Sequence, residues 1–210
     1  MLSLFTTLKN AFKYRGQLAP WSDATVEDLT FNISTYHVRS FTSKLGGKMY
    51  DGEGLPLIKF NRESRGMRTN GKIEAHSTDF RFLINIRDDN FGVLVNGKPL
   101  GIIQSSGTVL NADRKPIGSA VHPLKASANI LGVKMRFADN TFPIHLYGKQ
   151  IATMRVSPTS SNSARITLNE HFPGDTIVKV HGEITQEEEM WLIAMAIIEV
   201  VYHGHWIIGV

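Results

Sequence analysis

The densest group of charged side chains lies between residues 59 and 72, where five cations accompany a single acid, Glu63. The guanidinium of arginine matches the oxygens of a phosphate bidentately, and lysine adds a flexible point charge. The stretch is therefore a candidate site for anionic lipid headgroups, and its members are Lys59, Arg62, Arg65, Arg68 and Lys72. An ordinary solvated surface loop is the competing interpretation.

A second cationic segment lies at the N-terminus, where the first 22 residues contain no Asp or Glu. Apolar side chains recur at helical spacing over residues 2–14, which predicts an N-terminal amphipathic helix within residues 1–16. This helix packs on the domain, lies on a membrane surface, or acts as a transit-type targeting segment. On a membrane its contact residues are predicted to be Leu4, Phe5, Leu8, Lys9, Phe12 and Lys13.

Catalytic and metal-binding patterns are absent from the sequence. It has no nucleophile elbow, P-loop, dinucleotide fingerprint or zincin motif, and no cysteine to act as a thiol nucleophile. His203 and His205 supply two imidazoles without an identifiable third ligand, and Glu199 interrupts an apolar segment. We therefore expect a protein that is not an enzyme and needs no metal or cofactor.

Composition sets the broad class. The chain has 210 residues, of which 42% are apolar and 20% charged, as in a globular protein with one main domain. The net charge of +4 is too small to indicate a nucleic-acid partner, so none is expected. Absence of cysteine fits a reducing compartment, and we expect a cytoplasmic protein, with peripheral membrane attachment as one option.

The C-terminal region predicts a helix over residues 186–203. Thr185 and Glu188 form a capping-box pattern, and the run from 190 to 198 is wholly apolar. A helix without a polar face must be enclosed by protein or by lipid. A membrane span needs about 20 apolar residues. Since Glu199 ends the run early, the pattern favours enclosure by protein, with a span over 190–210 or an oligomer contact as the alternatives.

Residues 25–183 alternate between apolar and polar side chains, as half-buried strands do, and glycine-rich turns separate the runs. A weak repeat places Lys98, Lys115 and Lys149 each after a turn and before an aliphatic and a small residue. We expect about 10–12 short antiparallel strands. They would form a closed β-barrel over residues 25–210 that encloses the hydrophobic C-terminal helix.

This arrangement resembles the tubby C-terminal-like superfamily, which includes the tubby proteins, the LURP-one-related proteins and the phospholipid scramblases. The likeness covers about residues 75–205 and rests on the repeated turn units, a late strand over 176–181 and the acidic-capped apolar helix over 187–202. It implies a closed antiparallel barrel threaded by a helix, and association with anionic lipid. The chain lacks a cysteine-rich stretch and a calcium loop, so the resemblance does not imply calcium-activated scrambling.

The sequence thus predicts a non-enzymatic binding module that associates peripherally with anionic phospholipid at a membrane surface. The alternative is a soluble protein-interaction or structural scaffold that binds an unidentified protein and has no lipid role.

Overall fold

The computed structural model describes residues 13–14, 17–26, 28–39, 42–65, 70–88, 90–119, 140–156 and 175–199. Within these ranges the protein is mainly β, with one C-terminal α-helix, as the sequence predicts. The elements are the short 3-10 helix η1 (Trp21–Asp23), twelve strands and one helix: β1 (Asp28–Arg39), β2 (Thr42–Asp51), β3 (Pro56–Arg65), β4 (Asn70–His76), β5 (Arg81–Arg87), β6 (Asn90–Val95), β7 (Lys98–Ile103), β8 (Thr108–Asn111), β9 (Pro116–Ser119), β10 (Asn140–Leu146), β11 (Lys149–Val156), β12 (Asp175–Val180) and α3 (Gln186–Ile198).

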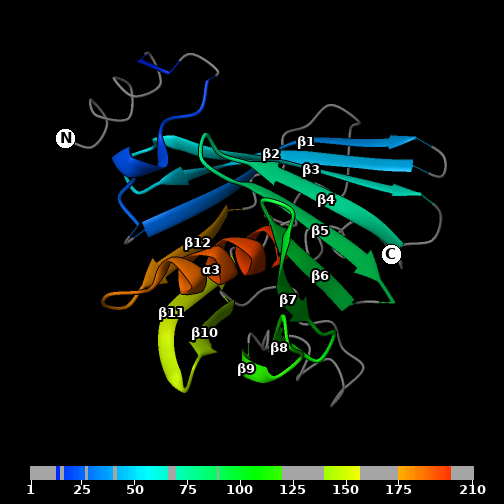
Figure 1. The fold of residues 1–210 in the computed structure, drawn as a ribbon. Helices are drawn as coiled ribbons and strands as arrows, with labels where there is room; N and C mark the ends of the chain where they lie inside the picture. Colours follow the sequence, from blue (N-terminus) through cyan, green and yellow to red (C-terminus); the bar gives the residue numbers. More distant parts are fainter. Residues whose placement is uncertain are drawn as a thin grey trace.

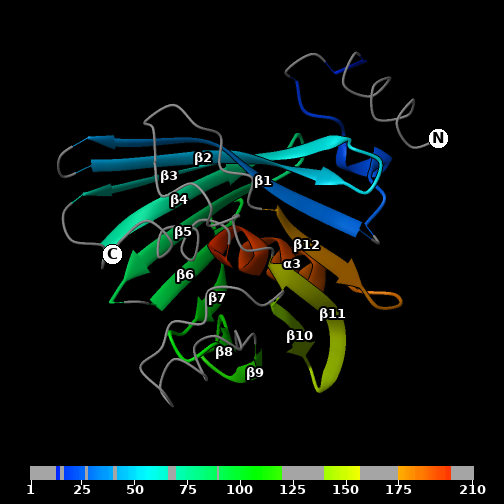
Figure 2. The ribbon, with the colours of Figure 1, turned by 180° about the vertical axis from the view of Figure 1, so that it is seen from behind.

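All strand pairings within this part of the chain are antiparallel. The strand order is β1-β12-β11-β10-β9-β8-β7-β6-β5-β4-β3-β2, and β2 pairs with β1 in turn. The narrowest junction joins β9 to β10 through two residue pairs, Ser119 with His145 and Gly118 with Leu146. Figures 1 and 2 show α3 lying between β1–β5 on one side and β10–β12 on the other.

Helix α3 begins where the sequence predicts. Thr185 Oγ1 accepts a hydrogen bond from the amide of Glu188, and the Glu188 carboxylate accepts one from the amide of Thr185. Every residue from Met190 to Ile198 is buried. Of the predicted 186–203 helix, residues 200–203 lie outside the described residues. Within the described ranges, no helix combines the length and apolar character needed to cross a membrane.

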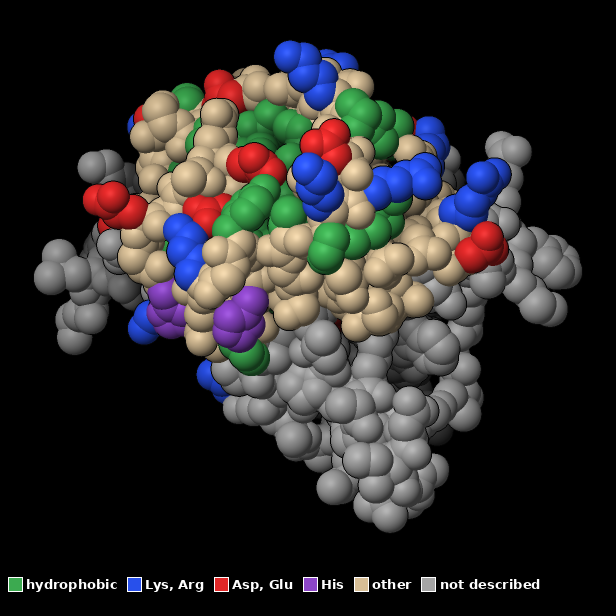
Figure 3. Space-filling model, turned by 60° about the horizontal axis from the view of Figure 1, so that its bottom comes forward, with side chains coloured by type: hydrophobic (Ala, Val, Ile, Leu, Met, Phe, Trp, Pro, Cys, Tyr) green, Lys and Arg blue, Asp and Glu red, His purple; other side chains and the backbone are tan. Residues whose placement is uncertain are grey.

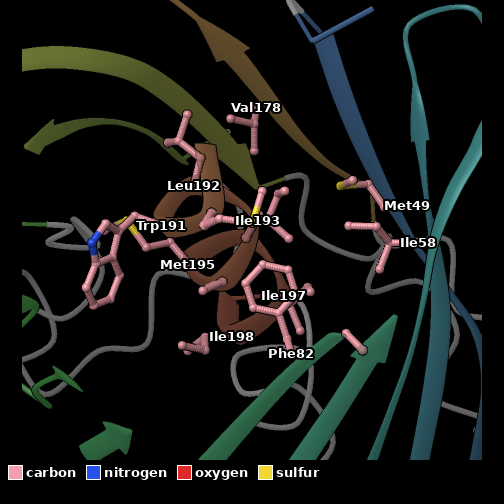
Figure 4. Packing of buried hydrophobic residues seen from close by; sticks show 14 of the residues in the cluster. Met49, Ile58, Phe82, Val178, Trp191, Leu192, Ile193, Met195, Ile197 and Ile198 are labelled. Atoms are coloured by element: carbon pink, nitrogen blue, oxygen red, sulfur yellow. The ribbon is translucent and has the colours of Figure 1, made fainter. Parts of the chain in front are cut away.

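The core is built from the inward face of the strands and from α3. On β5 the alternation predicted from the sequence is confirmed, because Phe82, Ile84 and Ile86 are buried and Arg81 is exposed. Figure 4 shows side chains of α3 grouped with Phe82 of β5 and Val178 of β12. The helix therefore has apolar partners on more than one side, as a helix with no polar face requires.

The predicted repeat corresponds to a repeated irregularity of the sheet. A β-bulge follows each repeated turn and leaves one aliphatic residue without a partner: Leu100 in β7, Ile117 in β9 and Ile151 in β11. Bulges bend a strand and increase its twist, which a strongly curved sheet needs. The carbonyls of Ile117 and Ile151 accept hydrogen bonds from the amides of Tyr147 and His181, so these two bulges join their hairpins to the next segment.

The small residue of each repeat follows the bulge directly. A Cβ atom at Gly101 would overlap the carbonyl oxygen of Leu110, and one at Gly118 would overlap that of His145. Neighbouring backbone thus passes too close for a side chain at these two positions. The third unit has Ala152 here, which is fully buried.

Candidate functional site

The structure divides the predicted headgroup cluster. Lys59 and Lys72 are exposed on β3 and β4, whereas Arg62 is buried. Arg65 ends β3 with its side chain outside the described residues, and Arg68 lies outside them altogether. Of the predicted membrane-contact residues only Lys13 is described, and it is exposed, with Nζ 4.8 Å from the ring centroid of Tyr14. The others, which are Leu4, Phe5, Leu8, Lys9 and Phe12, lie outside the described residues.

Arg62 does not belong to the exposed surface, which corrects the sequence-based assignment. Only 1% of this residue is accessible, and it shares the inward face of β3 with Phe60. In register it lies between Leu45 of β2 and Ile73 of β4. Because side chains alternate along a strand, Arg62 points to the interior while Lys59 and Asn61 point outward. It therefore cannot contact an anion at the outer face.

Lys72 is exposed, but its charge already has a partner. Its Nζ lies 2.6 Å from Oε1 of Glu74, two residues along the same face of β4, and both side chains are about half exposed. An exposed pair of this kind contributes little to stability, but it lowers the positive potential next to Lys72. Among the described residues of the predicted cluster, Lys59 is thus the cation that is exposed and forms no ion pair.

The sheet gives Lys59 new neighbours. Lys59 on β3 is directly opposite Lys48 on β2 and, on its other side, directly opposite His76 on β4. His76 is in turn directly opposite Arg81 on β5. We call these four residues the cationic row. Lys59, His76 and Arg81 are exposed and Lys48 is partly exposed. The residues beside them in the strands point inward, so the row lies on the outer face of β2–β5.

The row is electrostatically unfavourable within the protein itself. Residues directly opposite each other in antiparallel strands have Cβ atoms about 4.5–5.5 Å apart, and like charges there destabilise the sheet. In the part of the chain that the structure describes, no ion pair or hydrogen bond involves any of the four side chains. The positive charges of Lys48, Lys59 and Arg81 are therefore available to an external anion.

Sequence reasoning missed Lys48, His76 and Arg81 as members of this site. Alternation along β5 does predict that Arg81 faces outward. The row itself, however, depends on how four strands are aligned with one another, and no local sequence pattern predicts that register. Lys48 and Lys59 lie on the two strands of one hairpin, β2 and β3, and are 11 positions apart in the chain.

A different charged cluster lies at the N-terminal end of α3. Residues of the β10–β11 turn and of β11 contact the acidic side chains in the first turn of this helix. Lys149 Nζ lies 3.0 Å from Glu188 Oε1, and the hydroxyl of Tyr147 donates a hydrogen bond to Glu187. Burial acts to raise the pKa of Glu188, but hydrogen bonds from Thr185 and Lys149 outweigh it and lower the pKa. Burial, together with the hydrogen bond to Glu187, raises the pKa of Tyr147 to about 12.

The third acid of that turn holds the N-terminal segment. Trp21 Nε1 donates a 3.2 Å hydrogen bond to Glu189 Oε1, and burial raises the pKa of Glu189 despite this bond. On the face in Figure 3, basic and acidic side chains are interspersed, and hydrophobic side chains lie between them. The contacts of Glu187, Glu188 and Glu189 thus join the first turn of α3 to Tyr147, Lys149 and Trp21.

No metal site accompanies either cluster: within the described residues, no group of three or more His, Asp or Glu side chains is arranged to hold a metal ion. Comparisons of the chain with family models, with curated proteins and with solved structures find no match.

Proposed function

We propose that this protein is a non-enzymatic module that binds anionic phospholipid at a membrane surface through the outer face of β2–β5. One observation carries the proposal: the cationic row places Lys48, Lys59, His76 and Arg81 side by side, and none of the four side chains forms an ion pair within the described residues. Lys48 and Lys59 are like charges directly opposite each other, and such a pair costs stability. An anionic partner on that face removes the cost.

The shape of the row favours an extended anionic surface. Adjacent strands are about 4.8 Å apart, so the four side chains span roughly 14 Å along a line across the sheet. A lone phosphate would need donors that converge on one point, whereas a membrane offers many phosphates in a plane. Each Lys or Arg near an anionic leaflet contributes about 1 kcal/mol, so the two lysines and Arg81 together give about 3 kcal/mol. Such binding is weak and sensitive to salt.

The proposal extends to the fold and the family. We infer that the twelve strands make a closed barrel around α3, and that the chain is a member of the tubby C-terminal-like superfamily. The strand order, in which β2 pairs with β1, and the burial of residues 190–198 support the first inference. An enclosed α3 leaves electrostatic contact at the outer face as the mode of attachment, which agrees with peripheral binding.

The test is co-sedimentation of the full chain with vesicles of phosphatidylcholine alone or mixed with phosphatidylglycerol, at low and high salt. We expect binding only to the anionic vesicles and release by high salt. The triple variant Lys48→Gln, Lys59→Gln, Arg81→Gln should lose at least tenfold in partitioning. The control Lys98→Gln, Lys115→Gln, Lys179→Gln removes the same charge from exposed positions elsewhere and should retain most binding.

Equal losses in the two triple variants would show that net charge alone drives binding, and the row would then have no special role. Absence of binding by the folded wild-type chain would contradict a lipid function altogether.

A protein-interaction scaffold is the second candidate. It is favoured by Tyr147 in the turn between β10 and β11, whose large side chain is 49% exposed. Tyrosine is enriched at protein interfaces. This function would be supported instead if the chain does not bind anionic vesicles but forms a stable complex with another protein, and if Tyr147→Ala disrupts that complex.

A further inference from the structure

His76 occupies an inner position of the cationic row, between Lys59 of β3 and Arg81 of β5. It is exposed and directly faces no acid across either strand pair. On its own strand, Glu74 is paired with Lys72. In the turn that follows, the carboxylate of Asp79 accepts hydrogen bonds from the amide of Trp21 and the hydroxyl of Thr78. Both of these acids are thus engaged by other groups.

We propose that His76 links membrane binding to pH, so that the protein binds an anionic surface together with a proton at this imidazole. This inference rests on the proposed function. Histidine is the side chain whose charge ordinarily changes between pH 5 and 8. The row therefore combines three permanent cations with one imidazole, which lies between Lys59 and Arg81.

The physical basis is the coupling between two ligands of one site. A proton on His76 adds a like charge between Lys59 and Arg81, which is unfavourable in the free protein. A plane of phosphates against the same face compensates that charge. By thermodynamic reciprocity, if the anionic surface favours the proton, then the proton favours binding of the surface to the same degree. Binding must then strengthen as the pH falls.

The expected size follows from one added charge. One cation near an anionic leaflet raises the partition coefficient about fivefold. Binding should therefore be roughly fivefold tighter at pH 5.5 than at pH 7.5. Because one group takes up one proton, the change cannot exceed about tenfold per pH unit.

The test measures partitioning of the full chain onto phosphatidylglycerol vesicles from pH 8.0 to 5.5 at constant ionic strength. Phosphatidylglycerol is chosen because its phosphodiester stays ionised over this range. His76→Gln should bind at the weak, high-pH level throughout. His76→Lys should bind at the tight level throughout. The control His181→Gln removes an exposed imidazole outside the row and should keep the pH dependence of the wild type.

The outcomes separate this inference from the function on which it rests. Salt-sensitive binding that is equally tight at pH 7.5 and pH 5.5 would overturn the proton linkage and leave the lipid function standing. A pH dependence that survives in His76→Gln would also overturn it. No binding at any pH by a chain with the wild-type circular dichroism spectrum would overturn both.

Discussion

The ammonium of Lys149 lies 3.0 Å from the Glu188 carboxylate, which joins the β10–β11 turn to the first turn of α3. Lys149 is half exposed, whereas Glu188 is only 3% exposed. Lys98 and Lys115 occupy the same place in the other two repeats, and no ion pair involves them in the described part of the chain. The repeat therefore supplies a matched comparison within one molecule.

Replacing Lys149 by Met should destabilise the protein by about 1 kcal/mol, because the buried carboxylate of Glu188 loses its counter-charge. Solvent exposure of the lysine limits the effect. Lys115→Met is the control and should change the free energy of unfolding by less than about 0.5 kcal/mol. Urea denaturation of both variants measures the difference, and equal effects would mean that the ion pair contributes nothing.

Acid should weaken the protein through Glu188. Its pKa in the folded protein is lower than its ordinary value of 4.5, so below that pH the unfolded chain binds more protons than the folded chain. The stabilisation is present above the ordinary value and is lost as the pH falls through the lowered pKa. Glu188→Gln should therefore show a smaller loss of stability than the wild type between pH 5 and pH 3, measured by urea denaturation.

Glu189 is the control for that experiment, with the opposite sign. Burial raises its pKa in the folded protein. Its contribution is present below the ordinary value and is lost as the pH rises through the raised pKa. Glu189→Gln should therefore not reduce the acid-induced loss. If both variants behave alike, the acid response arises elsewhere in the chain.

Gly118→Ala should destabilise the protein by about 2 kcal/mol or more, because its Cβ would overlap the carbonyl oxygen of His145 on β10. The β9–β10 junction, which has only two residue pairs, would have to separate. Gly92→Ala is the control, since a Cβ there meets its nearest atom, the Asn85 carbonyl oxygen, at 3.9 Å. Thermal denaturation should rank the two variants clearly, and similar melting temperatures would argue against a tight β9–β10 contact.

Arg62 and Lys59 should differ in membrane binding although only three positions separate them. Arg62→Met keeps an inward side chain of similar length, so vesicle partitioning of the folded variant should stay within about twofold of the wild type. Lys59→Met should lose about fivefold, since it removes one cation of the row. Partitioning is compared after circular dichroism confirms folding. A larger loss for Arg62→Met would restore Arg62 to the binding surface.

The local elements could be predicted from the sequence because their signals are local. The capping box of Thr185 and Glu188, the apolar run that follows and the alternation along β5 each depend on neighbours a few residues apart. Period-two alternation from Phe60 also indicates an inward Arg62, but the basic composition of residues 59–72 led to its assignment as a headgroup ligand, which its burial does not support. The repeat around Lys98, Lys115 and Lys149 was visible, but its bulges were not.

Only the tertiary structure decided which charges meet. The partners of Lys59 are His76 on one side and Lys48 on the other, and a shift of one residue in either register would replace the partner on that side. Likewise, only the packing of β11 against α3 brings Lys149 to Glu188 and leaves Lys98 and Lys115 without that partner. Strand register and helix placement arise from the sum of many long-range contacts, and such sums leave no signature at a single position in the chain.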